Sequence, residues 1–372
     1  MPHARLEGRT AALWAEADVR TGGDRPWDLQ VHDPCFHVRV LGQGSLGLGE
    51  SYMDGWWDAA SLDGLLVRLL AARVDERVHG AGEVFDALRA RLTNLQSPRR
   101  SGEVGRRHYD LGNDLYAAML GRRLVYSCGY WRNATDLDAA QEAKLDLVCR
   151  KLRLRPGMRV LDIGCGWGEA LKFAAERHGV SGVGITVSRE QADYARRLCA
   201  DLPVEIRQQD YRVLDEPFDA AFSLGMFEHV GAKNYDVYFD VVRRCLPSEG
   251  VFLLHTIGGD RSVLRSDPWI ARYIFPNSML PSAAQIAQAI EGRFVLEDWH
   301  NFGADYDRTL QAWRANVESA WAVLDARYDE RFRRMWRFYL AVSMATFRSR
   351  RSQLWQLVLS PRGVPGGYVA PR

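Results

Sequence analysis

The length of the chain, 372 residues, suggests one large catalytic domain and a smaller companion. Its composition, 47% hydrophobic and 26% charged residues, is typical of a globular protein. Its 49 basic and 47 acidic residues give a formal net charge of +2, which excludes a protein that binds bulk nucleic acid through a strongly positive surface. No segment approaches the roughly 20 apolar residues of a membrane-spanning helix, and the first residues lack a signal-peptide core, so we expect a cytoplasmic protein.

Residues 1–95 are interpreted as a small amino-terminal domain of mixed helix and strand. A glycine-dense stretch, LGQGSLGLGESYMDGWWD, spans residues 41–58, and helical spacing follows at 62–74 and 84–92. Residues 96–107, QSPRRSGEVGRR, are polar and basic without apolar periodicity, which is typical of a linker. The arginines of this segment are a candidate contact for anionic phosphates: Arg99, Arg100, Arg106 and Arg107.

From about residue 158 strands and helices alternate, which predicts a doubly wound parallel α/β sheet within a catalytic domain that spans residues 108–372. Apolar runs indicate strands at 159–164, 182–188, 204–210, 219–226 and 250–258. Helices are expected between these strands at 169–179, 189–202 and 233–246. Gly179 closes the first helix and Ser188 caps the second. A sheet of this kind binds its ligand at the carboxyl ends of its strands.

Residues 259–293 interrupt this alternation and are interpreted as an insertion that forms a substrate lid beside the ligand-binding edge. A strand, two long amphipathic helices and a last strand follow, at 294–303, 306–328, 330–350 and 352–360. We expect the tail, residues 361–372, to be disordered.

A glycine-rich turn follows the first strand of this sheet in the sequence VLDIGCGWG, residues 160–168. Gly164, Gly166 and Gly168 form a G-x-G-x-G pattern in place of the dinucleotide-binding G-x-G-x-x-G. The bulky Trp167 beside the turn suits a ligand that stacks adenine and amino-acid parts better than one that presents a pyrophosphate. The pattern therefore favours S-adenosylmethionine, and a tight turn without a ligand is the alternative.

Polar residues lie inside or at the ends of three neighbouring strands. Asp162 inside the first strand and Asp210 at the end of the third are placed to receive the methionine amino group and the adenine amine. The second strand ends near Thr186, Ser188 and Gln191 instead of the ribose-binding acid common in methyltransferases.

Several stretches, spread over both expected domains, resemble those of the bacterial cyclopropane-fatty-acyl-phospholipid synthases. They are GSLGLGESYMDGWWD, HYDLGNDLY, YSCGYW, VLDIGCGWG, QDYR, GMFEHVGAKNYDVYF, FLLHTIG, YIFPN, LPS, EDWHNFGADYD and RSQLWQ. The resemblance implies a Rossmann-like class I methyltransferase domain with a small mixed amino-terminal domain. It also implies a homodimer that acts on unsaturated phospholipids at the inner face of the membrane, with the amino-terminal domain helping to pair the chains and to seat the membrane.

Members of this family add a methylene group, taken from the methyl group of S-adenosylmethionine, across a cis double bond of a phospholipid acyl chain. An alkene is a weak nucleophile, so the site must hold the methyl group near attack distance in a dry pocket. A base must then remove a proton from the transferred methyl group so that the ring closes. The resemblance implies that this base is a bound bicarbonate, held by Cys128, Glu228, His255, the backbone of Ile257, and Tyr306.

Each of these residues also has an ordinary structural interpretation. Without the resemblance, Cys128 and His255 would be core residues, Glu228 would cap a turn and Tyr306 would begin its helix. A carboxylate beside an anion also requires that Glu228 or the carbonate is protonated, or that Glu228 orients a donor.

The resemblance further implies the residues that bind the cofactor, with Tyr211 as the neighbour of adenine. They are Tyr126, Ser127, Gly164, Gly166, Thr186, Gln191, Asp210, Tyr211 and Arg212. Six aromatic residues are candidates for lining the acyl channel, with ordinary core packing as the alternative: Trp131, Phe227, Tyr273, Phe275, Trp313 and Trp355.

Two other function classes stay open. A methyltransferase of the same superfamily would stop at the transferred methyl group on a lipid chain or a small amine, and a lipid-binding or scaffold protein would keep the fold without the chemistry. A methyltransferase acting on nucleic acid is disfavoured, because the chain lacks an N-P-P-Y or P-C motif and a strong positive charge. Six cysteines without a C-x-x-C pair argue against zinc and against a disulfide framework, so no metal is expected.

Overall fold

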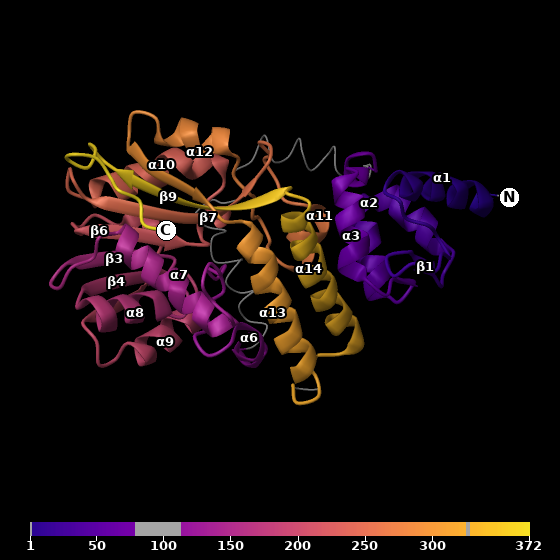
Figure 1. Ribbon diagram of the computed structural model, residues 1–372, viewed down its shortest axis with the longest axis horizontal. Helices are drawn as coiled ribbons and strands as arrows, with labels where there is room; N and C mark the ends of the chain where they lie inside the picture. The colour runs from indigo at the N-terminus through magenta and orange to yellow at the C-terminus, as the bar shows by residue number, and fades with distance from the viewer. Residues whose placement is uncertain (1, 79–112, 325–327) are drawn as a thin grey trace.

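The computed structural model describes residues 2–78, 113–324 and 328–372, and its main feature is a seven-stranded sheet with the order β5-β4-β3-β6-β7-β9-β8 (Figure 1). The strands are β3 (Arg159–Ile163), β4 (Ser181–Thr186), β5 (Val204–Gln208), β6 (Ala220–Leu224), β7 (Val251–Gly259), β8 (Val295–Asn301) and β9 (Ser352–Ser360). The five strands from β5 to β7 pair in parallel, whereas β9 runs antiparallel between β7 and β8. The predicted doubly wound α/β sheet is confirmed.

Helices cover both faces of this sheet (Figure 1). One layer consists of α7 (Leu137–Lys151), α8 (Glu169–His178) and α9 (Arg189–Leu198), and the other of α10 (Tyr235–Arg244) and α12 (Ala283–Ile290). In β3, Val160 packs in the cluster of the first layer, while Leu161 and Ile163 pack in that of the second. Because both faces are covered, the inner parallel strands are largely apolar, which is why they could be recognised in the sequence, whereas β5 at the edge alternates apolar and polar residues.

The ends of α8 and α9 follow the predicted caps. Gly179 ends α8 with a φ of +64°, in the left-handed region that glycine adopts without strain. Ser188 precedes α9, and its hydroxyl accepts a hydrogen bond from the backbone N–H of Gln191 at 3.3 Å. These caps fix where the loops at the ligand-binding edge begin.

The glycine-dense stretch lies largely in a helix, α2 (Cys35–Met53), whose backbone kinks at Gly44 with a φ of +58°. A Cβ on Gly49 would lie 2.4 Å from the ring of Trp269 in α11 (Pro268–Tyr273). Gly49 thus permits a close approach between α2 and α11, which explains a glycine inside a helix. The other described elements of the amino-terminal part are α1 (Pro2–Glu16), α3 (Leu62–Ala71), η1 (Val74–Glu76) and the short pair β1 (Gln30–Val31) and β2 (Trp57–Asp58).

The amino-terminal helices pack on α14 (Glu330–Arg348), which forms a hairpin with α13 (Ala304–Ala320) (Figure 1). The ring of Phe338 lies 5.7 Å from Tyr52 and 4.7 Å from Trp269, measured between ring centroids. One hydrophobic cluster runs from these helices through α13 and α14 to α6 (Asn113–Leu120). The division into domains at residues 95 and 107 stays a prediction.

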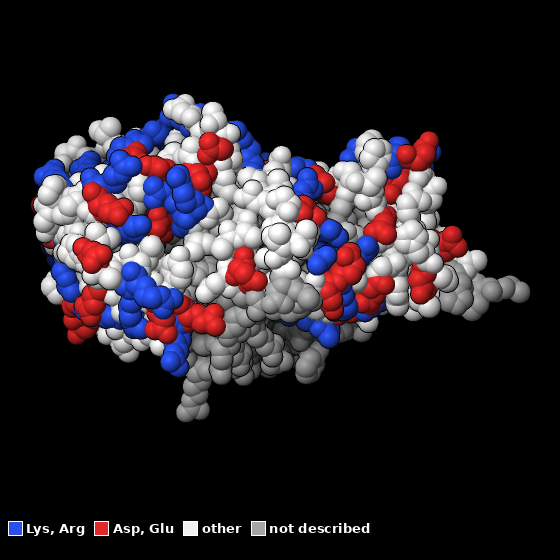
Figure 2. Space-filling model, turned by 90° about the horizontal axis from the view of Figure 1, so that it is seen from below, with Lys and Arg blue, Asp and Glu red and all other residues white. Residues whose placement is uncertain are grey.

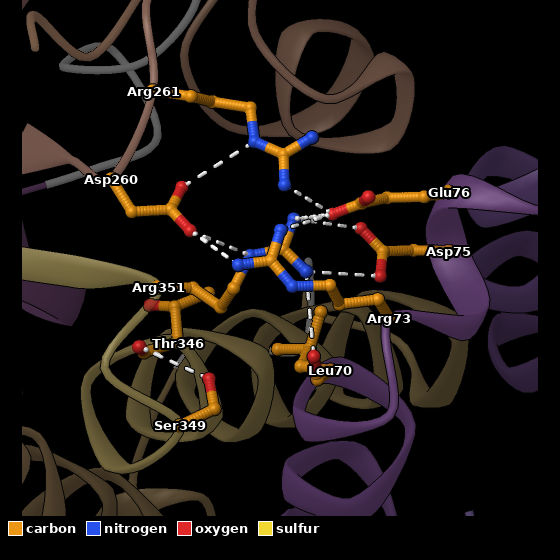
Figure 3. A network of polar contacts seen from close by, with 9 residues as sticks. All are labelled: Leu70, Arg73, Asp75, Glu76, Asp260, Arg261, Thr346, Ser349 and Arg351. Atoms are coloured by element: carbon orange, nitrogen blue, oxygen red, sulfur yellow. Dashed lines mark hydrogen bonds and ion pairs between the residues drawn. The ribbon is translucent and has the colours of Figure 1, made fainter. Parts of the chain in front are cut away.

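A polar network joins the end of the amino-terminal helices to the sheet (Figure 3). Arg351, just before β9, pairs with Asp75 at 3.2 Å and with Glu76 at 3.0 Å, and donates to the carbonyl oxygen of Leu70 at 3.3 Å. Asp260, just after β7, pairs with Arg73 at 3.0 Å. The network therefore ties the segment after α3 to the ends of two strands.

Within the 259–293 insertion, α12 packs against α10 and buries Ile286 and Ile290 in the sheet core, and a lid formed by the insertion stays a prediction. Two other sequence expectations are wrong. The first long helix of the hairpin ends at Ala320 rather than near residue 328. The tail is packed, since the Tyr368 hydroxyl donates to the carbonyl of Lys151 at 2.8 Å and Arg372 pairs with Asp298 at 2.6 Å.

The predicted linker at 96–107, its four arginines and the predicted helix at 84–92 lie outside the described residues. Within the part that is described, the search for a helix long and apolar enough to cross a bilayer found none. Figure 2 shows basic and acidic side chains interspersed over the described part of one face, in line with the balanced net charge.

Candidate active site

A cavity of about 180 Å³ lies at the carboxyl ends of β3, β4, β5 and β6, where a doubly wound sheet binds its ligand. Its lining includes eleven of the twelve residues expected to bind the cofactor: Tyr126, Ser127, Asp162, Gly164, Gly166, Thr186, Ser188, Gln191, Asp210, Tyr211 and Arg212. The loop after β6 and Asn277 of the 259–293 insertion complete the wall. The structure thus brings these expected residues around one cavity.

The three glycines of the turn have different roles. All have positive φ, but a Cβ on Gly166 would meet nothing within 4 Å, whereas one on Gly164 would lie 2.6 Å from the side chain of Met226. Gly168 does not line the cavity; a Cβ there would lie 2.9 Å from that of Ala195 in α9. Gly166 therefore leaves space for a ligand, while Gly168 lets α8 and α9 pack closely.

The polar groups of the second and third strand ends are held by local hydrogen bonds. The Thr186 hydroxyl donates to the side-chain carbonyl of Gln191 at 2.9 Å. Asp210 accepts bonds from Arg212 on both oxygens, at 2.9 Å from the backbone N–H and 2.8 Å from the guanidinium. Each carboxylate oxygen has two lone pairs, so Asp210 keeps acceptor capacity beside Tyr211.

Asp162 is buried in the cavity wall, and its Oδ1 has no hydrogen-bond partner among the described residues. Burial raises the pKa of this carboxyl group well above its usual value, and the charge of Lys144 opposes the shift. An orphaned buried acceptor is costly unless a ligand pairs with it. Asp162 is therefore prepared for a cationic or hydrogen-bond-donating ligand.

Glu228 lies in η4 (Phe227–His229), directly after β6, and its carboxylate is held against the end of β7. Its Oε1 accepts a hydrogen bond from the backbone N–H of Ile257 at 2.7 Å, while its Oε2 has no partner among the described residues. Burial raises the pKa of Glu228 to about 7. The side chain can therefore hold a proton and act as a donor near neutral pH.

His255 lies inside β7, within the strand expected at residues 250–258. Gln356 of β9 bonds to its Nδ1 at 3.2 Å, and its Nε2 has no partner among the described residues. Burial, with smaller contributions from Lys144 and Lys151, lowers the pKa of His255 well below its usual value, so the ring is neutral. When the Gln356 amide donates to Nδ1, the proton of the ring lies on Nε2 and is available to a ligand.

Cys128 lies against the first turns of α13, the helix that carries Tyr306. The Cys128 sulfur lies 3.7 Å from the hydroxyl of Thr309, which also accepts bonds from the backbone of Gly129 and the indole N–H of Trp131 at 3.1 and 2.9 Å. Tyr306 precedes Thr309 by three residues on the same helix, so both face the same side. Burial raises the pKa of the Cys128 thiol well above its usual value, which keeps it protonated and argues against a nucleophilic role.

The five expected catalytic residues do not line the cofactor cavity but lie in the packed region beside it. His255 and Ile257 point to one face of β7, because side chains two residues apart share a face. Ile257 packs against the hydrophobic cluster that contains Cys128 and Tyr306. Ile257, whose backbone N–H binds Glu228, and Cys128 therefore contact the same apolar cluster.

The six aromatic candidates for the acyl channel separate into two sets. Trp131 and Trp313 belong to the cluster around Cys128, and Tyr273 and Phe275 pack against it. The remaining two, Phe227 and Trp355, belong to the cluster under α10 and α12. Ordinary core packing therefore describes Phe227, whose ring stacks on Tyr235 at 4.3 Å.

Sequence reasoning missed several polar residues of this region: Lys144, His229, Asn277, Thr309 and Gln356. Lys144 carried a signal, because it occupies the same helical face as Ala140 and Val148, where a charged residue is unexpected. His229 lines the cavity, and burial lowers its pKa to about 4. Gln356 had no signal, since only the antiparallel pairing of β7 with β9 brings it to His255.

Comparisons with known proteins agree with this geometry. Residues 96–357 match the family model described as mycolic acid cyclopropane synthetase. The cyclopropane-fatty-acyl-phospholipid synthase of Escherichia coli strain K12 is 52% identical over 361 residues, which cover 97% of this chain and 94% of that protein. The tuberculostearic acid methyltransferase UfaA1 of Mycobacterium tuberculosis is 33% identical over 366 residues, with 91% and 84% covered.

A solved structure gives the same result for the fold. The mycolic acid cyclopropane synthase CmaA1, complexed with SAH and CTAB, superimposes with a TM-score of 0.64 and 31% identity, covering 70% of this chain and 98% of that chain. The predicted class I methyltransferase fold is confirmed.

Proposed function

Because the chain belongs to the mycolic acid cyclopropane synthetase family, we propose that it transfers a methylene group from S-adenosylmethionine to the cis double bond of an unsaturated phospholipid acyl chain, forming a cyclopropane ring. The observation that carries the proposal is the 52% identity to the Escherichia coli synthase over 97% of the chain. The cavity at the carboxyl ends of the strands supports the proposal.

The cavity residues fit S-adenosylmethionine, which supplies an electrophilic methyl group on a sulfonium. Asp162 offers an unpaired acceptor to the amino group of the methionine part. Gly166 leaves the backbone open to the ligand, and Tyr211 with Asp210 offers a ring face and an acceptor to the adenine. These assignments are part of the proposal.

The residues around Cys128 would exclude water from the reacting alkene. The cluster there is built from buried aromatic side chains, among them Trp131, Tyr306 and Trp313. Aromatic faces stabilise a neighbouring cation without attacking it, which suits a reaction whose intermediate is a carbocation. A protonated Cys128 thiol likewise does not compete as a nucleophile.

Bicarbonate would supply the base that removes a proton from the transferred methyl group. The orphaned Nε2 of His255 and the orphaned Oε2 of Glu228 support this part of the proposal, because both can donate to an anion when Glu228 is protonated. Burial favours that protonated form, which answers the difficulty of placing a carboxylate beside an anion. Cys128, Tyr306 and the backbone of Ile257 complete the proposed set.

We place the enzyme at the inner face of the membrane, on unsaturated phospholipids, as a homodimer. The support is the family relationship and the basic residues at 99–107, which would attract anionic lipid with about 1 kcal/mol each.

The experiment measures the transfer of a labelled methyl carbon from S-adenosylmethionine to the lipid in vesicles of unsaturated phospholipid. Wild type is expected to label the lipid, while Glu228→Ala and His255→Ala bind the cofactor but lose roughly 100-fold to 10,000-fold in rate. Carbonate depletion is expected to slow the wild type, and added bicarbonate to restore it. Absence of labelled lipid would overturn the proposed function, whereas a rate indifferent to carbonate would overturn only the bicarbonate assignment.

The similarity to the methyltransferase UfaA1 leaves one alternative to this function, the transfer of the methyl group to a lipid chain without ring closure. The two reactions differ in whether the transferred carbon loses a proton to close a ring, so the product distinguishes them.

A further inference from the structure

Two lysines of α7, Lys144 and Lys151, are completely buried. Burial of an ammonium group is costly unless the group is paired with a charge or a hydrogen-bond acceptor. Lys151 has such partners, because its Nζ lies 3.1 Å from a carboxylate oxygen of Asp298 and 3.3 Å from Nδ1 of His300. The Nζ of Lys144 instead contacts the hydroxyl of Ser127, at 3.0 Å.

The contact fixes the direction of the Ser127 hydroxyl. A lysine ammonium has three donors and no acceptor, so the Ser127 oxygen accepts and its own hydrogen must point elsewhere. Ser127 lines the cofactor cavity, while Lys144 lies behind it and does not. Lys144 therefore holds Ser127 as a hydrogen-bond donor toward the cavity.

Asp162 lines the same cavity and interacts electrostatically with Lys144. One end of the cavity thus combines an orphaned acceptor, Asp162 Oδ1, with a donor, the Ser127 hydroxyl, that has a buried positive charge behind it. An α-amino acid presents the complementary pair, an ammonium and a carboxylate. Hydrogen bonds with an ionised partner are about twice as strong as neutral ones.

We propose that Lys144 is a positioning residue that acts through Ser127 to bind the carboxylate of the amino-acid part of the cofactor, opposite Asp162, which binds its amino group. The inference rests on the proposed cofactor. Lys144, which lies outside the cavity, thus contributes to binding the amino-acid end of the ligand, while the other residues bind the adenosine part.

The charge environment of Lys144 supports this role. Burial lowers its pKa to about 7, while Cys128, Asp162 and Glu169 raise it. An anionic carboxylate bound to the Ser127 hydroxyl would add a further interaction that favours the charged form of Lys144.

The test compares two ligands by calorimetric titration: S-adenosylhomocysteine, and 5′-methylthioadenosine, which has the adenosine and thioether parts but no amino acid. Lys144→Met replaces the lysine with an unbranched apolar side chain that is one atom shorter, and it removes the charge. It is expected to weaken S-adenosylhomocysteine binding by roughly tenfold or more and to leave 5′-methylthioadenosine binding within about twofold of wild type.

Lys151→Met is the matched control, because it removes a second buried ammonium from the same helix while Asp298 keeps its pair with Arg372. Both affinities are expected to stay at the wild-type value. Lys144→Gln, which keeps an N–H donor, provides a second variant if Lys144→Met does not fold, and is expected to show the same selective loss to a smaller extent.

Three outcomes would count against the account in different ways. Unchanged S-adenosylhomocysteine affinity in Lys144→Met would overturn the inference. An equal loss of affinity for both ligands would also overturn the inference, because Lys144 would then only support the cavity as a whole. If the wild type bound neither S-adenosylmethionine nor S-adenosylhomocysteine, the proposed cofactor itself would fail.

Discussion

At Gly166 no neighbouring protein atom requires glycine; the reasons are its positive φ and the space for the ligand. Gly164 and Gly168 would each force a Cβ into a neighbouring side chain, but a Cβ on Gly166 would point into open space. The spacing of the motif alone does not distinguish the three glycines, because it does not show the direction of each Cα–H bond. Sequence reasoning placed Asp162 correctly in the cavity wall, since position within a strand sets the face, but it missed Lys144, whose role depends on a contact between helix α7 and the segment before it.

Gly166→Ala is therefore expected to weaken S-adenosylmethionine binding by roughly tenfold or more, because the added methyl group occupies ligand space. Gly157→Ala is the control: Gly157 also has positive φ, at +85°, and open space around its Cβ, but it lies in the turn before β3 and outside the cavity. Calorimetry should give equal losses of stability and unequal losses of affinity. Equal affinities in the two variants would remove Gly166 from the cofactor site.

Glu228 should make the protein less stable as the pH rises. Its carboxyl group has a pKa near 4.5 when unfolded and about 7 when folded, because burial disfavours the charge. Between these values the folded state holds a proton that the unfolded state has released, so the free energy of unfolding falls by about 1.4 kcal/mol per pH unit from this group. Glu228→Gln should therefore gain stability relative to wild type between about pH 5 and pH 7.

Urea unfolding at several pH values measures this difference, with Glu249→Gln, at an exposed glutamate, as the control. A constant difference between wild type and Glu228→Gln across that range would show that Glu228 is ionised in the folded protein. It would then also be unable to donate to an anion.

At the scale of elements, the strands and most helices could be predicted because their signals are local. The inner parallel strands, covered on both faces, are largely apolar, and Ser188 and Gly179 mark helix ends. The packing of α12 and of the tail could not be predicted, because each of them meets a surface formed by elements that are distant in sequence. Tyr368 and Arg372 are held by α7 and β8, which are distant in sequence.

Arg351 is expected to hold the segment after α3 against the sheet. Arg351→Met keeps the aliphatic length but removes the pairs with Asp75 and Glu76 and the bond to Leu70. For a network worth about 1 kcal/mol, the amides of α3 should exchange their hydrogens roughly fivefold faster, and the difference should shrink as salt is added. Hydrogen-exchange mass spectrometry checks this, with Arg350→Met, at the exposed neighbour, as the control. Unchanged exchange in Arg351→Met would show that apolar packing on α14 alone fixes these helices.

At the scale of the whole molecule, the order of strands and helices gave the fold class, while the position of the first 78 residues had no sequence signal. They pack on α14 through Tyr52 and Trp57, which meet Phe338 from the other end of the chain. The site is assembled in the same way, from the segment before α7, the ends of four strands, the 259–293 insertion and α13. Spacing within a motif could name many of these residues, but only the fold could separate the cavity from the packed region that holds Cys128, Glu228 and His255.

Ring closure distinguishes the proposed reaction from simple methyl transfer, and one measurement tests it directly. The enzyme is given S-adenosylmethionine with a fully deuterated methyl group and vesicles of unsaturated phospholipid, and the lipid product is analysed by mass spectrometry and proton magnetic resonance. The expected product is a cyclopropane whose bridging carbon keeps two deuterium atoms, because the base removes the third. A methyl branch that keeps all three deuterium atoms, or a lipid without deuterium, would contradict the proposed reaction.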